Sequence, residues 1–142
     1  MDEIAHAQLS DLDVDGVQMR AARMAGSGAH LAAHLQDAPV LLIPCMRGRI
    51  DHGASAMSAT FWASVMPAVW SFCLALRSRG MGTCWTTLHL FGKGERAASD
   101  VLGIPFDEYS QVGLFPIAYT KGVDFKPARR RAPEDVTHWN DW

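Results

Sequence analysis

Hydrophobic and polar positions follow a helical period in the middle of the chain. Between positions 61 and 76, apolar residues recur every three or four positions, the spacing that places side chains on one face of a helix. These residues are Phe61, Val65, Val69, Phe72, Cys73 and Leu76. Arg77 and Arg79 follow, where positive charge favours a helix C-terminus, and Gly80 supplies a left-handed stop. The pattern predicts a long helix that begins near Ser58 and ends before Gly80.

Pro67 lies inside this predicted helix. A proline in a helix interior removes a hydrogen bond and bends the axis, at a cost of about 3 kcal/mol. Such a residue is retained either as a plain kink or for a functional reason, and its position alone leaves both interpretations open.

Two continuous apolar runs, Pro39–Met46 and Gln111–Tyr119, predict buried strands. Each run contains a proline, Pro44 or Pro116, which cannot donate to a strand ladder. We therefore expect pairing to be incomplete or to end near Pro44. A third strand is predicted at Thr83–Leu88, where strand-favouring residues carry hydroxyl groups.

Two further helices are predicted on either side of these strands. The first spans Val17–Gln36, and Gly26-Ser27-Gly28 should bend it or divide it in two, because each glycine costs about 1 kcal/mol in a helix interior. The second is Glu95–Leu102, which ends at Gly103. The Gly-Ser-Gly stretch lacks the further residues of a dinucleotide or P-loop fingerprint, so it is a weak candidate for a phosphate site.

These elements divide the chain into three parts. Residues 1–16 are polar and acidic and are expected to be a mobile end. Residues 17–119 carry the predicted core, and residues 120–142 form an extended arm. Trp139 and Trp142 at the end of that arm are too large and apolar to remain in water without cause. We expect the arm to pack on a second protomer.

Length and charge limit the possible functions. The chain of 142 residues suffices for one domain, and its net charge of −2 and pI near 6.3 provide no broad basic field for nucleic acid or an anionic membrane. Cys45, Cys73 and Cys84 form no close pair, which favours reduced thiols. No apolar run is expected to reach the roughly 18 residues of a membrane span, and the acidic start lacks the features of a signal peptide. These features predict a soluble, cytoplasmic protein.

The segment Ser64–Thr87 reads S-x-x-P-A-x-x-x-x-x-L-x-x-R-x-x-G-x-G-T-C-W-T-T. It resembles the central segment of the nitroreductase family, dimeric proteins that bind FMN between two protomers. The tail segments LGIPFDEYSQVGLFPIAYTK and FKPARRRAPEDVTHW are also similar to that family. The resemblance extends from about Ala38 to the end of the chain. It implies an α+β (α/β/α-like) fold with a mixed central sheet flanked by helices, and a homodimer formed through the long helix and the arm.

The resemblance also implies a cofactor site. It places the residues Cys84, Trp85, Thr86 and Thr87 along the isoalloxazine ring of FMN. It places the basic run Arg129, Arg130 and Arg131 at the phosphate, and Ser64 and Pro67 on the helix beneath the cofactor. The alternatives are an ordinary strand with threonines facing water and a solvated run of charges. The family often has Gln-Asn where this chain has Trp70-Ser71.

In the family, NAD(P)H donates a hydride to flavin N5, and the reduced flavin then reduces a nitroaromatic, a quinone or another conjugated acceptor. The resemblance therefore implies an FMN-dependent oxidoreductase with no catalytic side chain of its own. The alternatives are a truncated, non-catalytic dimeric module that binds or sequesters flavin, and a protein whose basic arm meets an acidic partner.

Some features of the family are missing from this sequence. It lacks the N-terminal R-x-S-x-R pattern and the P-S-x-x-N-x-Q stretch that follows it. We therefore expect an N-terminally truncated domain, from a chain that is either naturally short or a fragment. His30 and His34 lie one turn apart, but no carboxylate or cysteine stands at ligand spacing, so no metal is expected. Cys84 has no identifiable base beside it and is not assigned as a nucleophile.

Overall fold

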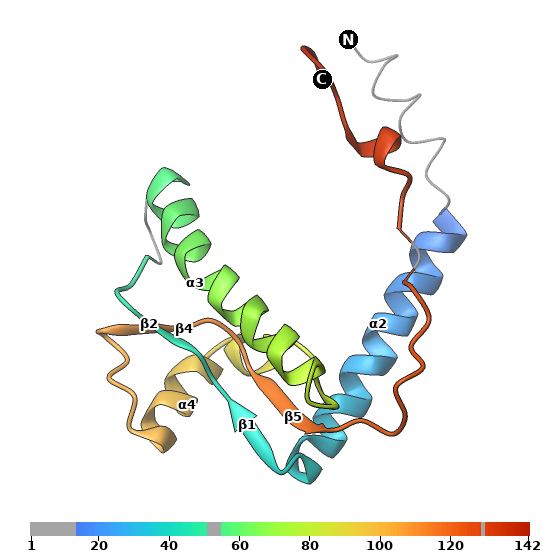
Figure 1. Ribbon diagram of the computed structural model, residues 1–142. Coiled ribbons are helices and arrows are strands. Elements are labelled where there is room, and N and C mark those ends of the chain that lie inside the picture. The colour runs from blue at the N-terminus through green and yellow to red at the C-terminus, as the bar shows by residue number, and fades with distance from the viewer. Residues whose placement is uncertain (1–13, 51–54, 129) are drawn as a thin grey trace.

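The computed structural model describes residues 14–50, 55–128 and 130–142. This part of the chain forms an α+β fold with three α-helices and two small sheets (Figure 1). The helices are α2 (Val14–His34), α3 (Ser55–Arg77) and α4 (Gly94–Leu102). Short 3-10 helices follow at Leu35–Asp37, Leu88–Leu90 and Pro133–Val136. The expected α+β class is confirmed.

The strands form two antiparallel sheets. In the first sheet, β5 (Phe115–Tyr119) lies between β1 (Val40–Leu42) and β3 (Met81–Thr83). In the second, β2 (Cys45–Arg47) pairs with β4 (Tyr109–Gln111). Every strand pairing among the described residues is antiparallel. The single mixed sheet that we expected is therefore replaced, in this part of the chain, by two antiparallel ones.

The two sheets arise because each predicted apolar strand is divided. The run 39–46 is interrupted at Ile43-Pro44, and the run 111–119 is interrupted between β4 and β5. Pro44 has no N–H for a ladder, but its carbonyl accepts a hydrogen bond of 2.9 Å from Val112 N–H. This bond joins the two interruptions. The expectation that pairing would end near Pro44 is confirmed, whereas continuous strands were wrong.

The strand predicted at 83–88 is shorter and lies earlier in the chain. β3 ends at Thr83, and beyond it only Thr86 pairs, through a single bridge to Leu114. The chain then turns into the 3-10 helix Leu88–Leu90. The hydroxyl-rich segment 84–87 is thus a connection along a sheet edge, because the register places Cys84 opposite Pro116 of β5, which has no N–H to donate.

The helix predictions are confirmed except at one point. α3 contains Pro67, and Gly80 after it adopts a left-handed φ of 73°. α4 ends at Gly103, also left-handed, whose N–H bonds to Ser99 O. The bend predicted at Gly26-Ser27-Gly28 is absent, since α2 is assigned as one helix through it. Its alanine-rich flanks supply high helix propensity, which outweighs two glycines.

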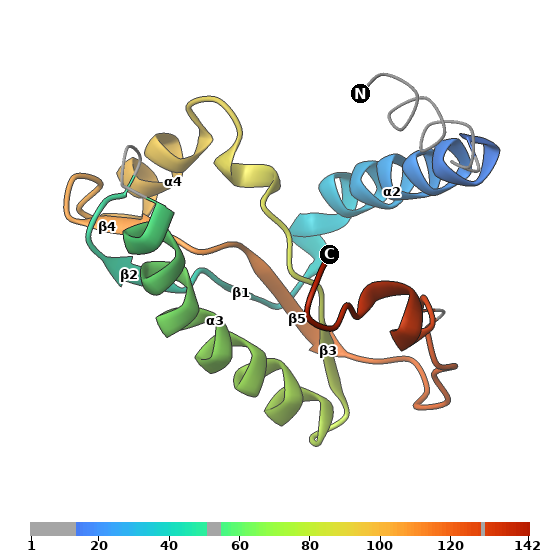
Figure 2. The same ribbon diagram turned by 90° about the horizontal axis from the view of Figure 1, so that it is seen from above.

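The core is small and lies where α3 crosses the sheets (Figure 2). Val69, Val112 and Phe115 form its buried centre, and Phe115 is fully buried. The predicted burial of the run 111–119 is confirmed as far as Ile117, whereas Ala118 and Tyr119 are exposed. β1 is not covered on both faces, since Val40 is 54% and Leu41 47% exposed. Most of α2 is exposed, and Figure 1 shows it projecting from the body of the fold.

The accessible surface of the chain is far larger than its mass requires. It measures 11589 Å² for 15.6 kDa. A compact monomer of this mass would expose about 7,250 Å², so the excess is roughly 4,300 Å². The face of α3 away from the core carries exposed apolar residues, among them Met57 and Trp70, which are 65% and 60% exposed. This surface is available to a partner.

One helix in the described part of the chain is long and apolar enough to cross a bilayer. This helix is α3, which has 23 residues. Only 11% of its most apolar 18-residue window is buried within this chain. The expectation that no segment would reach this length was therefore wrong. Length and composition alone are weak grounds for a membrane span, because the core helix of a soluble protein passes the same test.

Candidate functional site

A groove of about 480 Å³ lies between α2 and the segment that follows β3. Its walls come from residues of α2 and from the residues 84–88, namely Arg23, Met24, Ser27, Gly28, Leu31, Cys84, Trp85, Thr86, Thr87 and Leu88. The volume is within the usual range for small-molecule sites, roughly 300–1,000 Å³. All four residues that we expected along a cofactor ring therefore share one cavity.

The backbone of this segment presents an open edge. Thr86 N–H donates to Leu114 O at 3.0 Å, and Leu114 N–H donates to Thr86 O at 2.8 Å. In an extended chain the backbone groups of successive residues point to opposite sides. The N–H groups of Trp85 and Thr87 therefore point away from Leu114, and neither donates a hydrogen bond to any residue in the described part of the chain.

Trp85 holds this edge in place. Its indole Nε1–H donates to Val112 O at 3.3 Å, and its ring centroid lies 5.1 Å from that of Phe115. One side of the indole is thereby fixed on the core, while 38% of the residue remains exposed at the groove. Trp85 therefore acts mainly as a rigid support for the backbone of the 84–87 segment and less as a movable side of the groove.

A polar network supports the segment from below. Glu95 accepts two hydrogen bonds from the Arg49 guanidinium, at 2.9 and 3.2 Å. The same carboxylate accepts Gln111 N–H at 3.0 Å, and the Gln111 amide donates to Ser99 Oγ at 2.9 Å. His89 Nε2 lies 3.0 Å from Gln111 Oε1. The network thereby ties the 3-10 helix after Thr87 to β4 and α4.

The sequence profile of the Nitroreductase family matches residues 1–119. The chain belongs to the nitroreductase family. This membership supports an oxidoreductase of the flavin-dependent nitroreductase kind. A comparison with the sequences of curated proteins gives no match.

The matched region differs from the one that the motifs indicated. It begins at residue 1 and so includes α2, whereas the motif resemblance began near Ala38. It stops at Tyr119, before the arm in which the phosphate-binding arginines were placed. The part of this nitroreductase that forms the groove, α2 together with 84–88, lies entirely inside the matched region.

Sequence reasoning missed the contribution of α2. Met24, Ser27, Gly28 and Leu31 follow a spacing of three, four and seven residues, which places them on one helix face. That spacing is a usable signal, but the Gly-Ser-Gly stretch within it predicted only a helix break. Gly28 has open space where a Cβ would lie, so a ligand can approach the α2 backbone closely.

The predicted phosphate ligands do not lie in the groove. Arg130 and Arg131 are exposed on the arm and line none of the cavities named here, and Arg129 lies outside the described residues. Arg23 on α2 does line the groove. It is the arginine that this chain itself brings to the predicted ring-binding segment.

Ser64 and Pro67 lie elsewhere on α3. Ser64 lines a separate cavity of about 460 Å³ with Met46 and Met57, and its hydroxyl donates to Phe61 O at 2.7 Å. Pro67 is exposed and lines none of these cavities. Within one chain the structure does not bring either residue to the Cys84–Thr87 segment.

Cys84 and the histidines have no assigned chemistry. Partial burial raises the pKa of the Cys84 thiol above its ordinary value, which disfavours the nucleophilic thiolate. The His30 and His34 rings lie 4.4 Å apart, and His34 Nδ1 lies 3.0 Å from Asp37 Oδ2. No group of three metal-ligating side chains occurs among the described residues.

The groove fits the ring of a flavin. Unbonded N–H groups at Trp85 and Thr87 match the acceptor atoms along the pyrimidine edge of isoalloxazine, and the small residues Ser27 and Gly28 leave room on the opposite wall. Arg23 supplies one guanidinium for a phosphate. The donor set of the described residues thus suits FMN.

Proposed function

We propose that this nitroreductase-family protein is an FMN-dependent oxidoreductase that uses NAD(P)H to reduce a nitroaromatic, a quinone or another conjugated acceptor. The observation that carries the proposal is the open backbone edge at Trp85 and Thr87, which lines a cavity of suitable size. When bound, FMN would supply the redox chemistry, accepting a hydride from the nicotinamide and passing electrons to the acceptor.

The protein's own residues bind and orient the ring. The N–H groups of Trp85 and Thr87 would donate to its polar edge. Thr86 Oγ1 accepts a 3.2 Å hydrogen bond from Leu88 N–H, which leaves the Thr86 hydroxyl proton free to donate to the ring. Cys84 lines the same cavity, and partial burial raises the pKa of its thiol.

Phosphate binding is proposed to combine two sources. Arg23 lies in the groove of the same chain. Arg129, Arg130 and Arg131 would reach a phosphate from the arm of a second protomer, since an arm with exposed Trp139 and Trp142 has apolar surface to bury. A guanidinium fork matches two phosphate oxygens at once.

We propose a homodimer formed through α3 and the arm. Two chains together have roughly 8,600 Å² of excess surface, more than the roughly 2,000–5,000 Å² that obligate dimers usually bury in total, so a second protomer would cover a part of it. The apolar surface of α3 then needs no membrane, because a second protomer covers it. Ser64 and Pro67 are remote from the groove in one chain. In a dimer they would either lie beneath the cofactor bound by the partner or have only a structural role in α3.

We also propose a cytoplasmic location, with a small-molecule acceptor and without nucleic acid. The three cysteines are free in the structure, which suits a reducing compartment. The net charge of −2 offers no broad attraction for nucleic acid.

The proposal is tested by adding FMN to the purified protein and following quenching of flavin fluorescence, then oxidation of NADH and NADPH with a nitroaromatic and a quinone. We expect saturable quenching and turnover with one of the two nicotinamides. Thr86→Val should weaken FMN binding about tenfold, the scale of one hydrogen bond to a polar ring. Ser78→Ala is the matched control, because this exposed hydroxyl lies just after α3, donates to Ala75 O and lines none of the cavities described here.

The outcomes separate the function classes. Absence of quenching at high FMN concentration would refute the cofactor assignment. Tight FMN binding without turnover with any acceptor would favour the alternative, a flavin-binding or sequestering module. Equal loss of FMN affinity in Thr86→Val and Ser78→Ala would show that the site lies elsewhere.

A further inference from the structure

Three contacts anchor the backbone edge of the flavin groove to one short stretch of the chain, residues 111–114. The first two come from the Trp85 indole and from the backbone of Thr86, as described above. The third is a contact between side chains, in which His89 Nε2 lies 3.0 Å from Gln111 Oε1. The edge is thus held at its start, at its middle and just beyond its end.

The order of these contacts along the chain gives His89 a role of its own. The Trp85 N–H lies on one side of the Thr86 bridge, where the Trp85 indole supports it. The Thr87 N–H lies on the other side, between the bridge and the His89 contact. Leu90 N–H donates to Thr87 O at 2.9 Å, so the 3-10 turn that carries His89 is bonded directly to Thr87. Without His89, Thr87 would be anchored from one side alone.

The hydrogen bonds of the Gln111 amide fix which nitrogen of His89 carries the proton. Gln111 Nε2 donates to Glu95 O at 3.0 Å and to Ser99 Oγ at 2.9 Å. Glu95 O is a carbonyl oxygen that can only accept, so an amide turned by 180° would bring two oxygens together. Gln111 Oε1 therefore faces His89. Since an amide oxygen only accepts, His89 Nε2 must be the donor.

The other ring nitrogen of His89 has no partner. Nδ1 is buried and forms no hydrogen bond within the described part of the chain. A proton on Nδ1 would be a buried donor without an acceptor, which is unfavourable. The ring also borders a cavity of about 250 Å³ whose other residues are apolar apart from Thr86, namely Leu31, Ala32, Leu35, Leu88 and Leu114. These surroundings favour the neutral Nε2–H tautomer.

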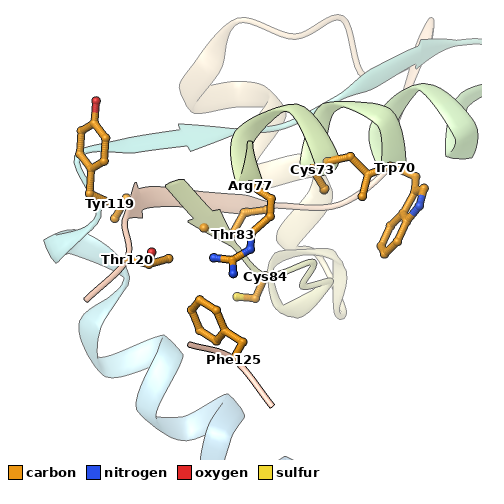
Figure 3. Close-up of a pocket in the computed structure, with 11 residues that line it drawn as sticks. Trp70, Cys73, Arg77, Thr83, Cys84, Tyr119, Thr120 and Phe125 are labelled. Carbon is orange, nitrogen blue, oxygen red and sulfur yellow. The ribbon is translucent and has the colours of Figure 1, made fainter. Parts of the chain in front are cut away.

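The His89 contact lies within one protomer and does not depend on the proposed dimer. The cavity that a second protomer would cover is a different one, of about 610 Å³, between the C-terminal half of α3, the β3–β5 edge and the start of the arm (Figure 3). Its lining residues include Arg77, Thr83, Cys84 and Phe125. Neither His89 nor Gln111 lines it.

We propose that His89 is a positioning residue for the flavin, which as the Nε2–H tautomer holds the turn after Thr87 on Gln111 and so keeps the Thr87 N–H directed into the groove. The inference rests on the proposed function, because it concerns the same backbone edge. A donor that is in place before the ligand arrives loses little conformational entropy on binding, and the ligand then binds more tightly. His89 does not itself line the flavin groove.

The first test compares two amide side chains at position 89. Gln can place a nitrogen close to the position of Nε2, whereas Asn is too short to reach Gln111. We expect His89→Asn to weaken FMN binding about tenfold and His89→Gln about threefold or less. Riboflavin should lose the same factor as FMN, because the edge binds the ring and not the phosphate.

His34→Asn is the matched control. His34 is exposed on α2, its Nδ1 lies 3.0 Å from Asp37 Oδ2, and it lines none of the cavities described here. The same substitution at this position should leave FMN affinity at the wild-type value.

Amide hydrogen exchange on the flavin-free protein reports on the turn directly. Leu90 N–H, which donates to Thr87 O, should exchange at least tenfold faster in His89→Asn than in the wild type. Thr120 N–H donates to Gly80 O at 3.1 Å beyond the opposite end of β5 and should keep its wild-type rate. Equal acceleration at both amides would show a general loss of stability and overturn the proposal.

The tautomer is measured on the wild-type chain from the nitrogen chemical shifts of the His89 ring. We expect a protonated Nε2 and a bare Nδ1 without any flavin present. A proton on Nδ1 and none on Nε2 would overturn the proposal, and this measurement decides the matter if His89→Asn does not fold. FMN binding that is unchanged in His89→Asn would refute the role of His89 alone. No FMN binding to the wild type would instead refute the proposed function itself.

Discussion

Thr86 and Leu114 exchange both of their backbone hydrogen bonds, at 3.0 and 2.8 Å, although neither lies in a strand. This single bridge fixes which side of the 84–87 segment faces the sheet and which side is open. The N–H groups of Trp85 and Thr87 become available to a ligand only because Thr86 is committed to Leu114. The bridge therefore determines which backbone N–H groups face the groove.

Gly113 is essential to this arrangement. A Cβ at this position would collide with the Trp85 indole, lying 2.8 Å from Cδ1 and against Nε1. Gly113→Ala should therefore push Trp85 from its support, lower the free energy of unfolding by about 1–3 kcal/mol, and weaken FMN binding. Urea unfolding and flavin titration measure the two effects.

Gly26→Ala is the matched control for that substitution. Gly26 lies in α2, where a Cβ would meet nothing within 4 Å, so alanine should raise helix stability by about 1 kcal/mol. Two glycine-to-alanine changes are thus expected to act in opposite directions. If Gly113→Ala is as stable as the wild type, the proposed support of the edge by Trp85 is wrong.

A comparison of FMN with riboflavin tests which arginines bind the phosphate. Arg23→Ala should weaken FMN more than riboflavin, which lacks the phosphate, by about tenfold for a lost charge-assisted pair. The double variant Arg130→Ala/Arg131→Ala should show the same preference if the arm reaches the site. Arg79→Ala provides the control, because Arg79 does not line the groove and donates to Ala75 O in α3. Equal losses for FMN and riboflavin would exclude a phosphate role for the arginine concerned.

Cys84 should titrate above an ordinary thiol. Because partial burial raises its pKa in the folded chain, the unfolded thiol loses its proton first as pH rises. The thiol therefore contributes its full stabilisation below the unfolded pKa, and that contribution is lost as pH rises through the folded pKa. In a Cys45→Ser/Cys73→Ser background, the iodoacetamide alkylation rate should reach its midpoint at higher pH in the folded chain than in urea. Identical midpoints would contradict the shift.

The dimer proposal is tested on the exposed surface of α3. Met57→Glu places a charge on a residue that is 65% exposed in one chain, so it should disturb the chain itself little. If a second protomer covers α3, this charge becomes buried without a partner, and sedimentation should show a monomer. Val101→Glu on α4, at a residue 84% exposed, is the control and should leave association unchanged. A wild-type chain that sediments as a monomer would refute the dimer.

The sequence determined the elements whose signals are local. The three- and four-residue period predicted α3, and the left-handed glycines at 80 and 103 predicted where α3 and α4 end. Local sterics and hydrogen bonding alone decide such features. The motif around Gly82-Thr83-Cys84-Trp85 likewise indicated the family and the segment that lines the groove, because it is contiguous in the chain.

Only the tertiary structure decided what faces that segment. Both apolar runs are divided between the two sheets, and the Val112–Pro44 hydrogen bond joins the two interruptions. α2 runs unbroken past Thr86 and brings Arg23 and Gly28 to a segment about 60 residues away. Contacts between residues so far apart depend on packing that no local pattern encodes. For the same reason the sequence identified Thr83 and Arg77 only as a strand residue and a helix end, whereas the fold places both in one cavity.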